Sequence, residues 1–133
     1  MTPGDRDRPT LRRRQRLLKT TEFRTVYAGR ARAGDGCLVA YARPNGLDAI
    51  RLGLSVGKRC GGAVQRNRIK RLLREAFRQT RAAFPSGYDI VLVPVAKAYT
   101  FAEVDASIRA LVAEAIRRAE RRRRDAAGKA TNG

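Results

Sequence analysis

One cluster of side chains in this sequence is suited to chemistry with phosphate groups. It lies in the stretch GGAVQRNRIKRLLREAFR, residues 61–78, which contains an Arg-Asn-Arg triplet and several further cations. Guanidinium and ammonium groups bind phosphate oxygens through charge-assisted hydrogen bonds, and arginine can do so with two parallel donors. The stretch therefore predicts a phosphate-binding surface on a basic helix.

Residues suited to bond-breaking chemistry are sparse by comparison. The chain has no histidine, the side chain that most often acts as a general base near neutral pH. Its carboxylates are scattered apart from Asp5 and Asp7, and Cys37 and Cys60 form no CxxC pair. Zinc binding and metal-assisted hydrolysis both require a cluster of such ligands. We therefore assign no catalytic residue and no metal site, and we expect both cysteines to be buried, reduced thiols.

Helical geometry separates the basic stretch into two faces. At about 100° per residue, a helix over residues 63–83 gathers its apolar side chains on one arc, which we expect to face a sheet. That arc consists of Ile69, Leu72, Leu73, Ala76 and Phe77. The opposite arc carries Asn67, Lys70, Arg71, Arg74 and Arg78. The pattern predicts a helix that is anchored by one face and offers the other to a ligand.

The alternative interpretation is a solvated structural helix that happens to be basic. Such helices usually alternate charge signs, because like charges at i,i+4 destabilise a helix by roughly a few tenths of a kcal/mol per pair. Glu75 is the one carboxylate between residues 63 and 81, and only Arg71 stands at the i,i+4 spacing from it. Because so many cations lack a partner in the helix, we favour binding to phosphates.

The whole chain is strongly basic, with 30 Lys and Arg residues against 12 Asp and Glu residues and a formal net charge of +18. Such a charge indicates a polyanionic partner, either nucleic acid or an acidic membrane. No run of about 18 apolar residues is present, and the first residues lack the apolar stretch of a signal peptide. A membrane-surface role ranks last, because the apolar face of the basic helix is committed to the sheet. We expect a cytoplasmic protein without a membrane partner.

The hydrophobic pattern predicts a small α/β (α+β) sandwich with the order α-β-β-(β)-α-β-α. We expect Gly29 to end the first helix in the left-handed conformation, and strands 37–44 and 49–57 to pair as a hairpin. A strand near 30–36 is weakly indicated. The continuous apolar run YDIVLVPV, residues 88–95, predicts a strand covered on both faces, and a last helix runs from Phe101 to about Arg123.

The segment RLGLSVGKRCGGAVQRNRIKRLLREAFR, residues 51–78, resembles the signature of the bacterial ribonuclease P protein subunit, in which an RNR triplet heads a long basic helix. RLLKTTEFRTVYAGR is similar to that family's opening helix, and YDIVLVPV to its strand after the basic helix. The resemblance covers residues 16–116, and GKRCGG departs from the family's more common Ser, two lysines and Asn. The resemblance implies a mixed sheet of about four strands with three helices. It also implies a left-handed crossover through the RNR helix, where general rules favour a right-handed one.

The resemblance also implies a function. The family supplies the protein component of ribonuclease P, a tRNA 5′-maturation endoribonuclease whose RNA subunit carries the chemistry. The implied partners are the catalytic RNA and precursor tRNA, the implied cofactor is Mg²⁺ held mainly by RNA, and no obligate protein partner is evident. The protein would raise the affinity for substrate and for Mg²⁺. On this basis we divide the chain into a flexible arm (1–16), a ribonuclease P protein-like RNA-binding domain (17–120) and a flexible basic tail (121–133).

The site residues follow by matching motif positions. RNA binding is implied for Lys58 and Arg59, which precede the helix, and for Arg66, Asn67, Arg68, Lys70, Arg71 and Arg74 of the RNR stretch. A cleft for the single-stranded 5′ leader is implied for Phe23, Tyr27, Tyr41 and Ser55, with Ser55 on the strand beside Tyr41. From spacing alone, an aromatic pair at i,i+4 is more often part of a core than of a ligand surface. We expect four further aromatic residues to be structural, namely Phe77, Phe84, Tyr88 and Phe101. The alternative function is a general RNA-binding protein of ribosomal type.

Overall fold

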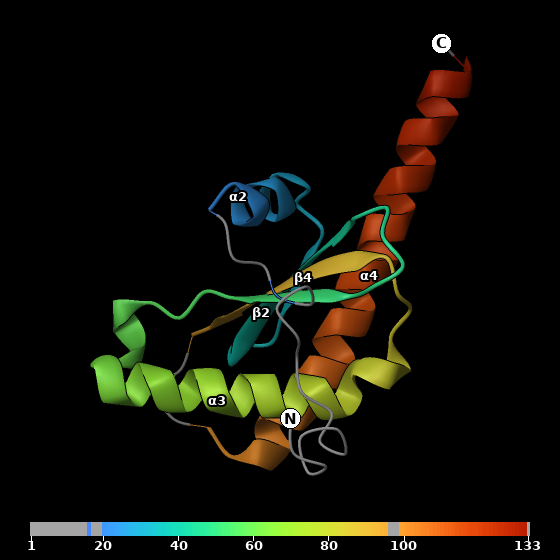
Figure 1. Cartoon of the computed structure of the whole chain (residues 1–133). Helices are drawn as coiled ribbons and strands as arrows, with labels where there is room; N and C mark the ends of the chain where they lie inside the picture. The colour runs from blue at the N-terminus through green and yellow to red at the C-terminus, as the bar shows by residue number, and fades with distance from the viewer. Residues whose placement is uncertain (1–15, 17–19, 96–98, 133) are drawn as a thin grey trace, which may run out of the picture.

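A four-stranded mixed sheet forms the middle layer of the protein, with helices on both faces (Figure 1). The computed structural model describes residues 16, 20–95 and 99–132. Its elements are α2 (Thr20–Ala28), β1 (Arg32–Gly34), β2 (Leu38–Pro44), β3 (Arg51–Leu54), the 3₁₀ turn η2 (Lys58–Cys60), α3 (Ala63–Thr80), the 3₁₀ turn η3 (Arg81–Ala83), β4 (Tyr88–Pro94) and α4 (Phe101–Asn132). The predicted order of helices and strands is confirmed, and the weakly indicated strand is β1.

β4 occupies a central position in the sheet, whose order is β1-β2-β4-β3. β2 pairs with β4 antiparallel and β3 pairs with it parallel, so Tyr41 and Gly53 both lie opposite Val91. The predicted hairpin between strands 37–44 and 49–57 is therefore wrong, because β4 separates them. The physical reason is that the apolar run of β4 is buried on both faces and gains most from a central place, as its sequence indicated.

The connection from β3 through α3 to β4 is left-handed. In Figure 1, β3 lies in front of its parallel neighbour β4, both strands run from right to left, and α3 returns below them. The family resemblance predicted this hand, which general topology rules would not have chosen. The crossover places α3 on the face of the sheet opposite to α2.

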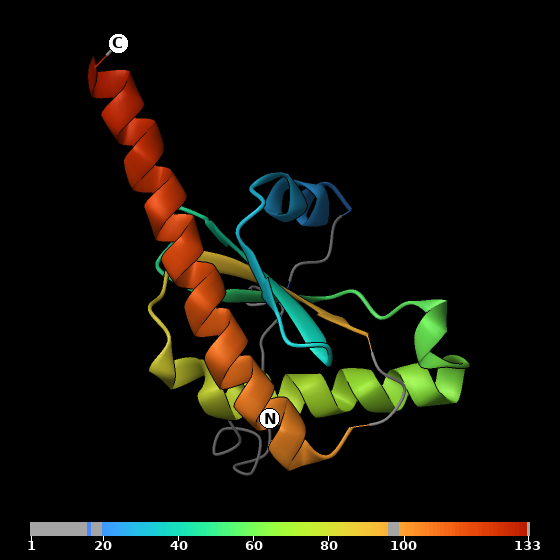
Figure 2. The same ribbon diagram turned by 180° about the vertical axis from the view of Figure 1, so that it is seen from behind.

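The main hydrophobic core lies between the sheet and the pair α3 and α4 (Figure 2). Leu72, predicted as an anchor of α3, is only partly buried. Of the aromatic residues predicted to be structural, Phe77 and Tyr88 are buried and Phe84 is partly buried, whereas Phe101 is 38 % exposed. A fully buried Leu or Phe side chain stabilises the folded state by about 1.5–3 kcal/mol. The buried side chains of α3 therefore fix the rotation of this helix about its axis. The buried residues of α3 are Ile69, Leu73, Ala76, Phe77 and Thr80.

The turn before α3 is held by a buried thiol and a glycine. Cys60 in η2 is completely buried, and its Sγ lies 3.6 Å from the carbonyl oxygen of Pro94. Gly61 follows with a φ of 114°, which is unfavourable for residues with a Cβ. A Cβ there would also collide with the side chain of Gln65. Cys60 is buried as predicted, whereas Cys37 is only partly buried.

The two outer helices end differently from the sequence prediction. At the end of α2, Arg30 rather than Gly29 adopts a positive φ, of 60°, while the backbone N–H of Arg30 donates to Tyr27 O at 3.1 Å. That conformation costs an arginine about 1–2 kcal/mol. α4 begins with a capping box between Thr100 and Glu103. It continues to Asn132, past the predicted helix end near Arg123 and into the stretch that was predicted to be a tail. The run after residue 117 consists mostly of Arg, Ala and Glu, which are strong helix formers.

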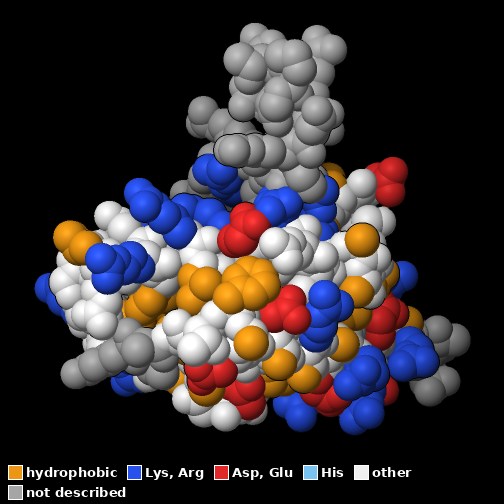
Figure 3. All heavy atoms as spheres, turned by 90° about the horizontal axis from the view of Figure 1, so that it is seen from below, with side chains coloured by type: hydrophobic (Ala, Val, Ile, Leu, Met, Phe, Trp, Pro, Cys, Tyr) orange, Lys and Arg blue, Asp and Glu red, His pale blue; other side chains and the backbone are white. Residues whose placement is uncertain are grey.

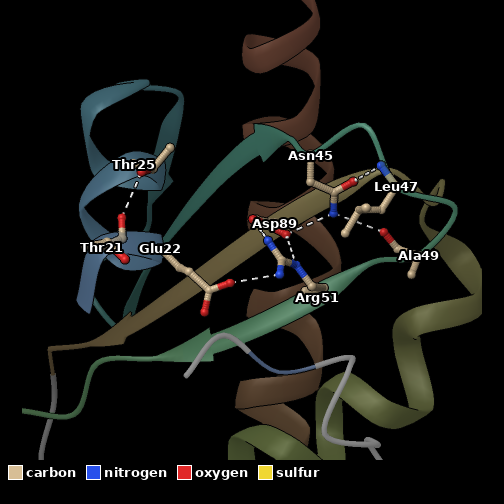
Figure 4. A network of polar contacts seen from close by, with 8 residues as sticks. All are labelled: Thr21, Glu22, Thr25, Asn45, Leu47, Ala49, Arg51 and Asp89. Carbon is tan, nitrogen blue, oxygen red and sulfur yellow. Dashed lines mark hydrogen bonds and ion pairs between the residues drawn. The ribbon is translucent and has the colours of Figure 1, made fainter. Parts of the chain in front are cut away.

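Arg51 connects α2 to the sheet through a polar network (Figure 4). Its guanidinium donates to both carboxylate oxygens of Asp89, at 2.7 and 2.6 Å, and to Oε2 of Glu22 at 2.9 Å. The amide of Asn45 donates to the same Asp89 carboxylate at 2.9 Å. The hydrogen bonds to Asp89 raise the pKa of Arg51 above its ordinary value, despite partial burial. Because Glu22 belongs to α2 and Asp89 to β4, this network sets where α2 lies over the sheet.

Replacing Asp89 by alanine should destabilise the protein through Arg51. The guanidinium of Arg51 would lose its paired acceptors while remaining only partly exposed, and we expect a loss of about 1–3 kcal/mol in the free energy of unfolding. Urea denaturation followed by circular dichroism measures this change. The control is Asp105→Ala, which breaks a surface pair with Arg109 and should cost less than about 1 kcal/mol. Equal losses in both variants would contradict the role of the network.

A second polar contact joins the β1–β2 turn to α4. The carboxylate of Asp35 accepts from the backbone N–H groups of Cys37 and Leu38, at 2.9 and 3.1 Å, and from the hydroxyl of Ser107 at 2.6 Å. Burial opposes ionisation of this carboxyl group. The hydrogen bonds from Ser107, Leu38 and Cys37 outweigh that effect and lower the pKa of Asp35 below its ordinary value of 3.8.

Asp35→Asn should therefore make stability less sensitive to acid. A carboxyl group with a lowered pKa in the folded state stabilises that state above its unfolded pKa and loses this contribution as the pH falls through the folded value. We expect the variant to be less stable near neutral pH, and its deficit relative to the native chain to shrink between about pH 5 and about pH 2. Urea denaturation across this range measures the deficit. A deficit that stays constant with pH would argue against the prediction.

Candidate nucleic-acid interface

α3 carries its cations on the side of the helix that faces away from the core. Figure 3 views the face at the bottom of Figure 1, where α3 lies, and shows lysine and arginine side chains in groups, with apolar and acidic side chains between the groups. Of the predicted RNA-binding residues on α3, Arg66 and Lys70 are partly buried, and the exposed ones are Asn67, Arg68, Arg71 and Arg74. The structure thus brings all six together on one helix, with the orientation that the helical wheel predicted.

The cations of this face are not neutralised by the protein itself. Within the part of the chain that the structure describes, no ion pair involves Arg66, Arg68, Lys70, Arg71 or Arg74. Glu75 pairs with Arg78 rather than with Arg71, so the expectation that Arg78 faces outward without a partner is wrong. A carboxylate on the N-terminal side of its cation is the more favourable order in a helix, because it agrees with the helix dipole.

Two further cations extend the basic face at the start of α3. Lys58 and Arg59 are exposed in η2, directly before the helix. Gly62 is the N-cap and supplies no side-chain acceptor to the first backbone N–H groups of α3. Those N–H groups give a helix N-terminus a partial positive charge, so the two side chains add to a potential of the same sign. The predicted pair therefore lies where phosphates would be attracted most strongly.

Two features of the basic face are unfavourable in the free protein. Nε of Arg66 is buried and has no hydrogen-bond partner among the described atoms, a situation that costs about 1–3 kcal/mol. Burial lowers the pKa of Arg74, and the nearby charge of Arg16 lowers it further. Arg16 forms a parallel bridge with Leu52 at the edge of β3, so it joins this face. No pattern in the sequence identifies Arg16, which the sequence prediction places in a flexible arm; residues 1–15 lie outside the described residues.

The predicted aromatic cleft lies on the opposite face of the sheet, beneath α2. Phe23, Tyr27 and Tyr41 are all partly buried there around the fully buried Val26 and Val91. The rings of Tyr27 and Tyr41 meet edge to face, with centroids 4.9 Å apart and an interplanar angle of 77°. They also line a pocket of about 310 Å³, which we call the tyrosine pocket. The aromatic pair thus serves as a small core while keeping part of its surface open to a ligand.

Ser55 does not stand beside Tyr41 as predicted. Because β4 lies between β2 and β3, the residue two strands across from Tyr41 is Gly53, and Val91 lies between them. Two strand spacings amount to roughly 10 Å, which is too far for direct contact between the small side chain of Ser55 and the ring. Gly53 and Val93, which sequence reasoning missed, also belong to this face. The alternation of apolar residues in β3 and β4 would have identified them had the strand order been known.

The described residues offer no membrane span and no protein metal site. None of their helices is long and apolar enough to cross a membrane. In the same part of the chain, no three His, Cys, Asp or Glu side chains lie together in a way that could hold a metal ion. The chemical capacity of the site is therefore that of a basic surface on one face and an aromatic pocket on the other.

Comparisons with known proteins agree with this geometry. The family model for ribonuclease P matches residues 11–116. The ribonuclease P protein component of Caldanaerobacter subterraneus is 45% identical over 78 residues, which is 59% of this chain and 67% of that protein. That of Thermotoga petrophila is 37% identical over 94 residues, 70% of this chain and 80% of that protein.

Solved structures show the same fold. The Staphylococcus aureus RNase P protein has a TM-score of 0.67 at 31% identity, covering 74% of this chain and 92% of that one. The Thermotoga maritima RNase P protein has a TM-score of 0.65 at 31% identity, covering 71% of this chain and 91% of that one. The resemblance inferred from the RNR stretch is confirmed, and this chain belongs to the ribonuclease P protein family.

Proposed function

We propose that this chain is the protein subunit of ribonuclease P and binds the catalytic RNA of that enzyme through α3 and η2. The observation that carries the proposal is the exposed row of cations on α3 without carboxylate partners among the described residues. Such a row repels itself in the free protein and is stabilised by phosphates. In this proposal, Lys58, Arg59 and the RNR-stretch residues contact RNA backbone.

The contribution of the protein is electrostatic and positional. The exposed guanidinium groups of Arg68 and Arg71 lie against phosphates and screen their mutual repulsion, which lets catalytic RNA and substrate approach each other. Mg²⁺, when bound, supplies the activation of the attacking water, and we assign its ligands to RNA. A lower repulsion between strands also lets RNA retain Mg²⁺ at a lower concentration of the free ion. Catalysis in this proposal is therefore a property of RNA, and the protein raises both affinities.

The tyrosine pocket is proposed to hold the single-stranded 5′ leader of precursor tRNA. Partly exposed aromatic rings stack on bases of any sequence, and each stacked base contributes about 1–3 kcal/mol to binding. This tolerance suits leaders of differing sequence. Tyr27 and Tyr41, which line the pocket, are the proposed stacking surface together with Phe23, which packs beside them around Val26 and Val91. Ser55 lies farther along the same face. The Arg51–Asp89 network supports the pocket because it fixes α2, which carries two of the three rings.

A general RNA-binding protein of ribosomal type is the rival function. It would use the same basic face, since charge alone does not select an RNA. It differs in having no role for the tyrosine pocket and predicts no preference for tRNA that carries a leader. The family membership and the position of the aromatic pair opposite the basic face both favour the ribonuclease P role.

Cleavage at low Mg²⁺ tests the proposed function directly. The full-length protein, a bacterial ribonuclease P RNA and a precursor tRNA are combined, and mature 5′ ends are counted over time. We expect faster cleavage with protein. The double variant Arg68→Gln/Arg71→Gln should lose most of this gain. It should also flatten the salt dependence of RNA binding by about one unit for each phosphate that the variant no longer binds. Arg109→Gln/Arg123→Gln, which removes the same number of cations from α4, is the matched control and should behave as the native chain. Cleavage that is no faster with protein would refute the function.

Replacing Tyr41 tests the leader pocket separately from the basic face. Tyr41→Leu keeps an apolar side chain against Tyr27 but removes the aromatic face, so we expect precursor tRNA binding to weaken by about 1–3 kcal/mol. Binding of mature tRNA, which has no leader, should stay unchanged. Fluorescence titrations of the assembled ribonucleoprotein with both tRNAs measure the two affinities. Equal losses for precursor and mature tRNA would overturn the assignment of the pocket.

A further inference from the structure

A second concentration of arginines lies at the β1 edge of the sheet, away from α3. The turn between α2 and β1 forms one wall, and the C-terminal part of α4, which projects on the α2 side of the sheet, forms the other (Figures 1 and 2). Together they enclose a pocket of about 730 Å³, which we call the arginine pocket. It is lined by Arg30, Arg32, Arg118, Arg121, Arg122 and Asp125.

The walls of the arginine pocket are held at a fixed distance. Arg118 donates to Oε1 of Glu114 at 3.1 Å and also to the backbone carbonyl oxygen of Arg32, which ties α4 to β1. Beneath this contact, α4 packs on β1, where Ala31, Ala33 and Ala119 are all buried. The small side chains bring the helix close to the strand. The pocket is therefore preformed rather than assembled by a ligand.

The charge of the arginine pocket is largely uncompensated. Five guanidinium groups and one carboxylate line it, which leaves four net positive charges. Among the described residues, Arg30, Arg32, Arg121 and Arg122 take part in no ion pair, although Asp125 lies in the same pocket. Other arginines of α4 do have such partners, since Arg109, Arg117 and Arg123 pair with carboxylates on their own helix. The free cations are thus concentrated where the surface is concave.

Arg30 links this pocket to the aromatic one. It is the one non-glycine residue with a positive φ in the described chain, although Gly29 beside it would take that conformation more easily. Arg30 and Arg32 line both the arginine pocket and the tyrosine pocket. Unfavourable backbone conformations that persist are often associated with binding sites. The two pockets are therefore neighbours that share a wall of two cations.

We propose that the arginine pocket is a second RNA-backbone site, which takes phosphates of the single strand that passes the tyrosine pocket. This inference rests on the proposed function for the identity of the polyanion as RNA. A single strand presents bases to aromatic rings and phosphates to cations at once, and the shared wall formed by Arg30 and Arg32 offers both contacts side by side. α3 lies on the opposite face of the sheet, so the same phosphates cannot occupy both basic sites.

The α4 wall of this site lies outside the stretch that the family model matches. That match ends at residue 116, before Arg118, Arg121 and Arg122. These residues and Asp125 recur at helical spacing of three and four, which places them on one face of α4. The exposed large apolar residues of the described chain, Leu47, Val64 and Phe101, do not line the pocket. A membrane-surface site would combine cations with apolar residues that insert into lipid, which favours RNA as the ligand.

Binding of a fluorescein-labelled uridine decamer to the free full-length protein tests this proposal. The variant is Arg121→Gln/Arg122→Gln, which removes two pocket cations and keeps good helix formers in place. The control is Arg109→Gln/Arg123→Gln, which removes the same charge from roughly the opposite side of the same helix. Fluorescence anisotropy over a series of salt concentrations gives affinity and its salt slope, and circular dichroism verifies that both variants keep the native helix content.

We expect the pocket variant to weaken decamer binding about tenfold and to reduce the salt slope by roughly 0.7 for each phosphate that it no longer binds, while the control stays within about twofold of the native chain. Equal losses in the two variants would mean that only net charge matters and would overturn the proposal. A pocket variant that loses binding to phosphatidylserine vesicles but keeps decamer binding would also overturn it, in favour of a membrane ligand.

The outcome is separable from that of the proposed function. The decamer experiment contains no ribonuclease P RNA, so a failure of protein-assisted cleavage does not alter its result. To separate the two basic sites, the same titration is repeated in the Arg68→Gln/Arg71→Gln background. We expect the pocket variant to cause the same fold-loss there as in the native background. A pocket effect that disappears in this background would place the decamer on α3 and would overturn the second site.

Discussion

The burial of one stripe of α3 is the constraint on which the rest of the structure depends. Each of the large side chains in this stripe, such as Leu73 and Phe77, gains about 1.5–3 kcal/mol from leaving water. The repulsion among the cations of α3 amounts to tenths of a kcal/mol per pair. Burial therefore wins, and the helix cannot rotate to separate its charges. The repulsion among its cations would destabilise α3 as an isolated helix. In the protein, packing against the core holds α3 with these cations directed to solvent.

The position of β4 gives the protein two different working faces. As an interior strand, it contributes Ile90 and Leu92 to the core under α3 and α4, and Asp89 and Val91 to the face under α2. Asp89 holds Arg51, which in turn holds Glu22 of α2, and Val91 supports the tyrosine pair. A single strand thus couples the basic face of α3 to the aromatic pocket through one rigid sheet. In the proposed function, this separation would let the two faces contact different parts of an RNA at once.

Local sequence patterns predicted the helices and strands and the orientation of α3. They did not predict the order of the strands in the sheet or the contacts between segments distant in sequence. The apolar run of residues 88–95 correctly indicated a strand buried on both faces, yet nothing in strands 37–44 and 49–57 indicated that it would separate them. That omission misplaced Ser55 beside Tyr41. Similarly, the charges of Arg118, Arg121 and Arg122 were visible, but Arg30 and Arg32 approach them only through the packing of β1 on α4. The hand of the crossover came from family resemblance alone.

The free protein retains several unfavourable features that all lie at its cationic surfaces. Nε of Arg66 lacks a partner among the described atoms, Arg16 raises the cost of charge on Arg74, and Arg30 adopts a left-handed backbone. None of these features stabilises the folded chain by itself, and each lies where an anionic ligand would reduce the repulsion. A ligand that binds the folded state but not the unfolded one stabilises it in proportion to the logarithm of its concentration over Kd. If RNA binds as proposed, the stability of the folded chain is therefore coupled to RNA. The residues that weaken the free protein, Arg16, Arg30, Arg66 and Arg74, are then close to the groups whose binding would stabilise the assembled one.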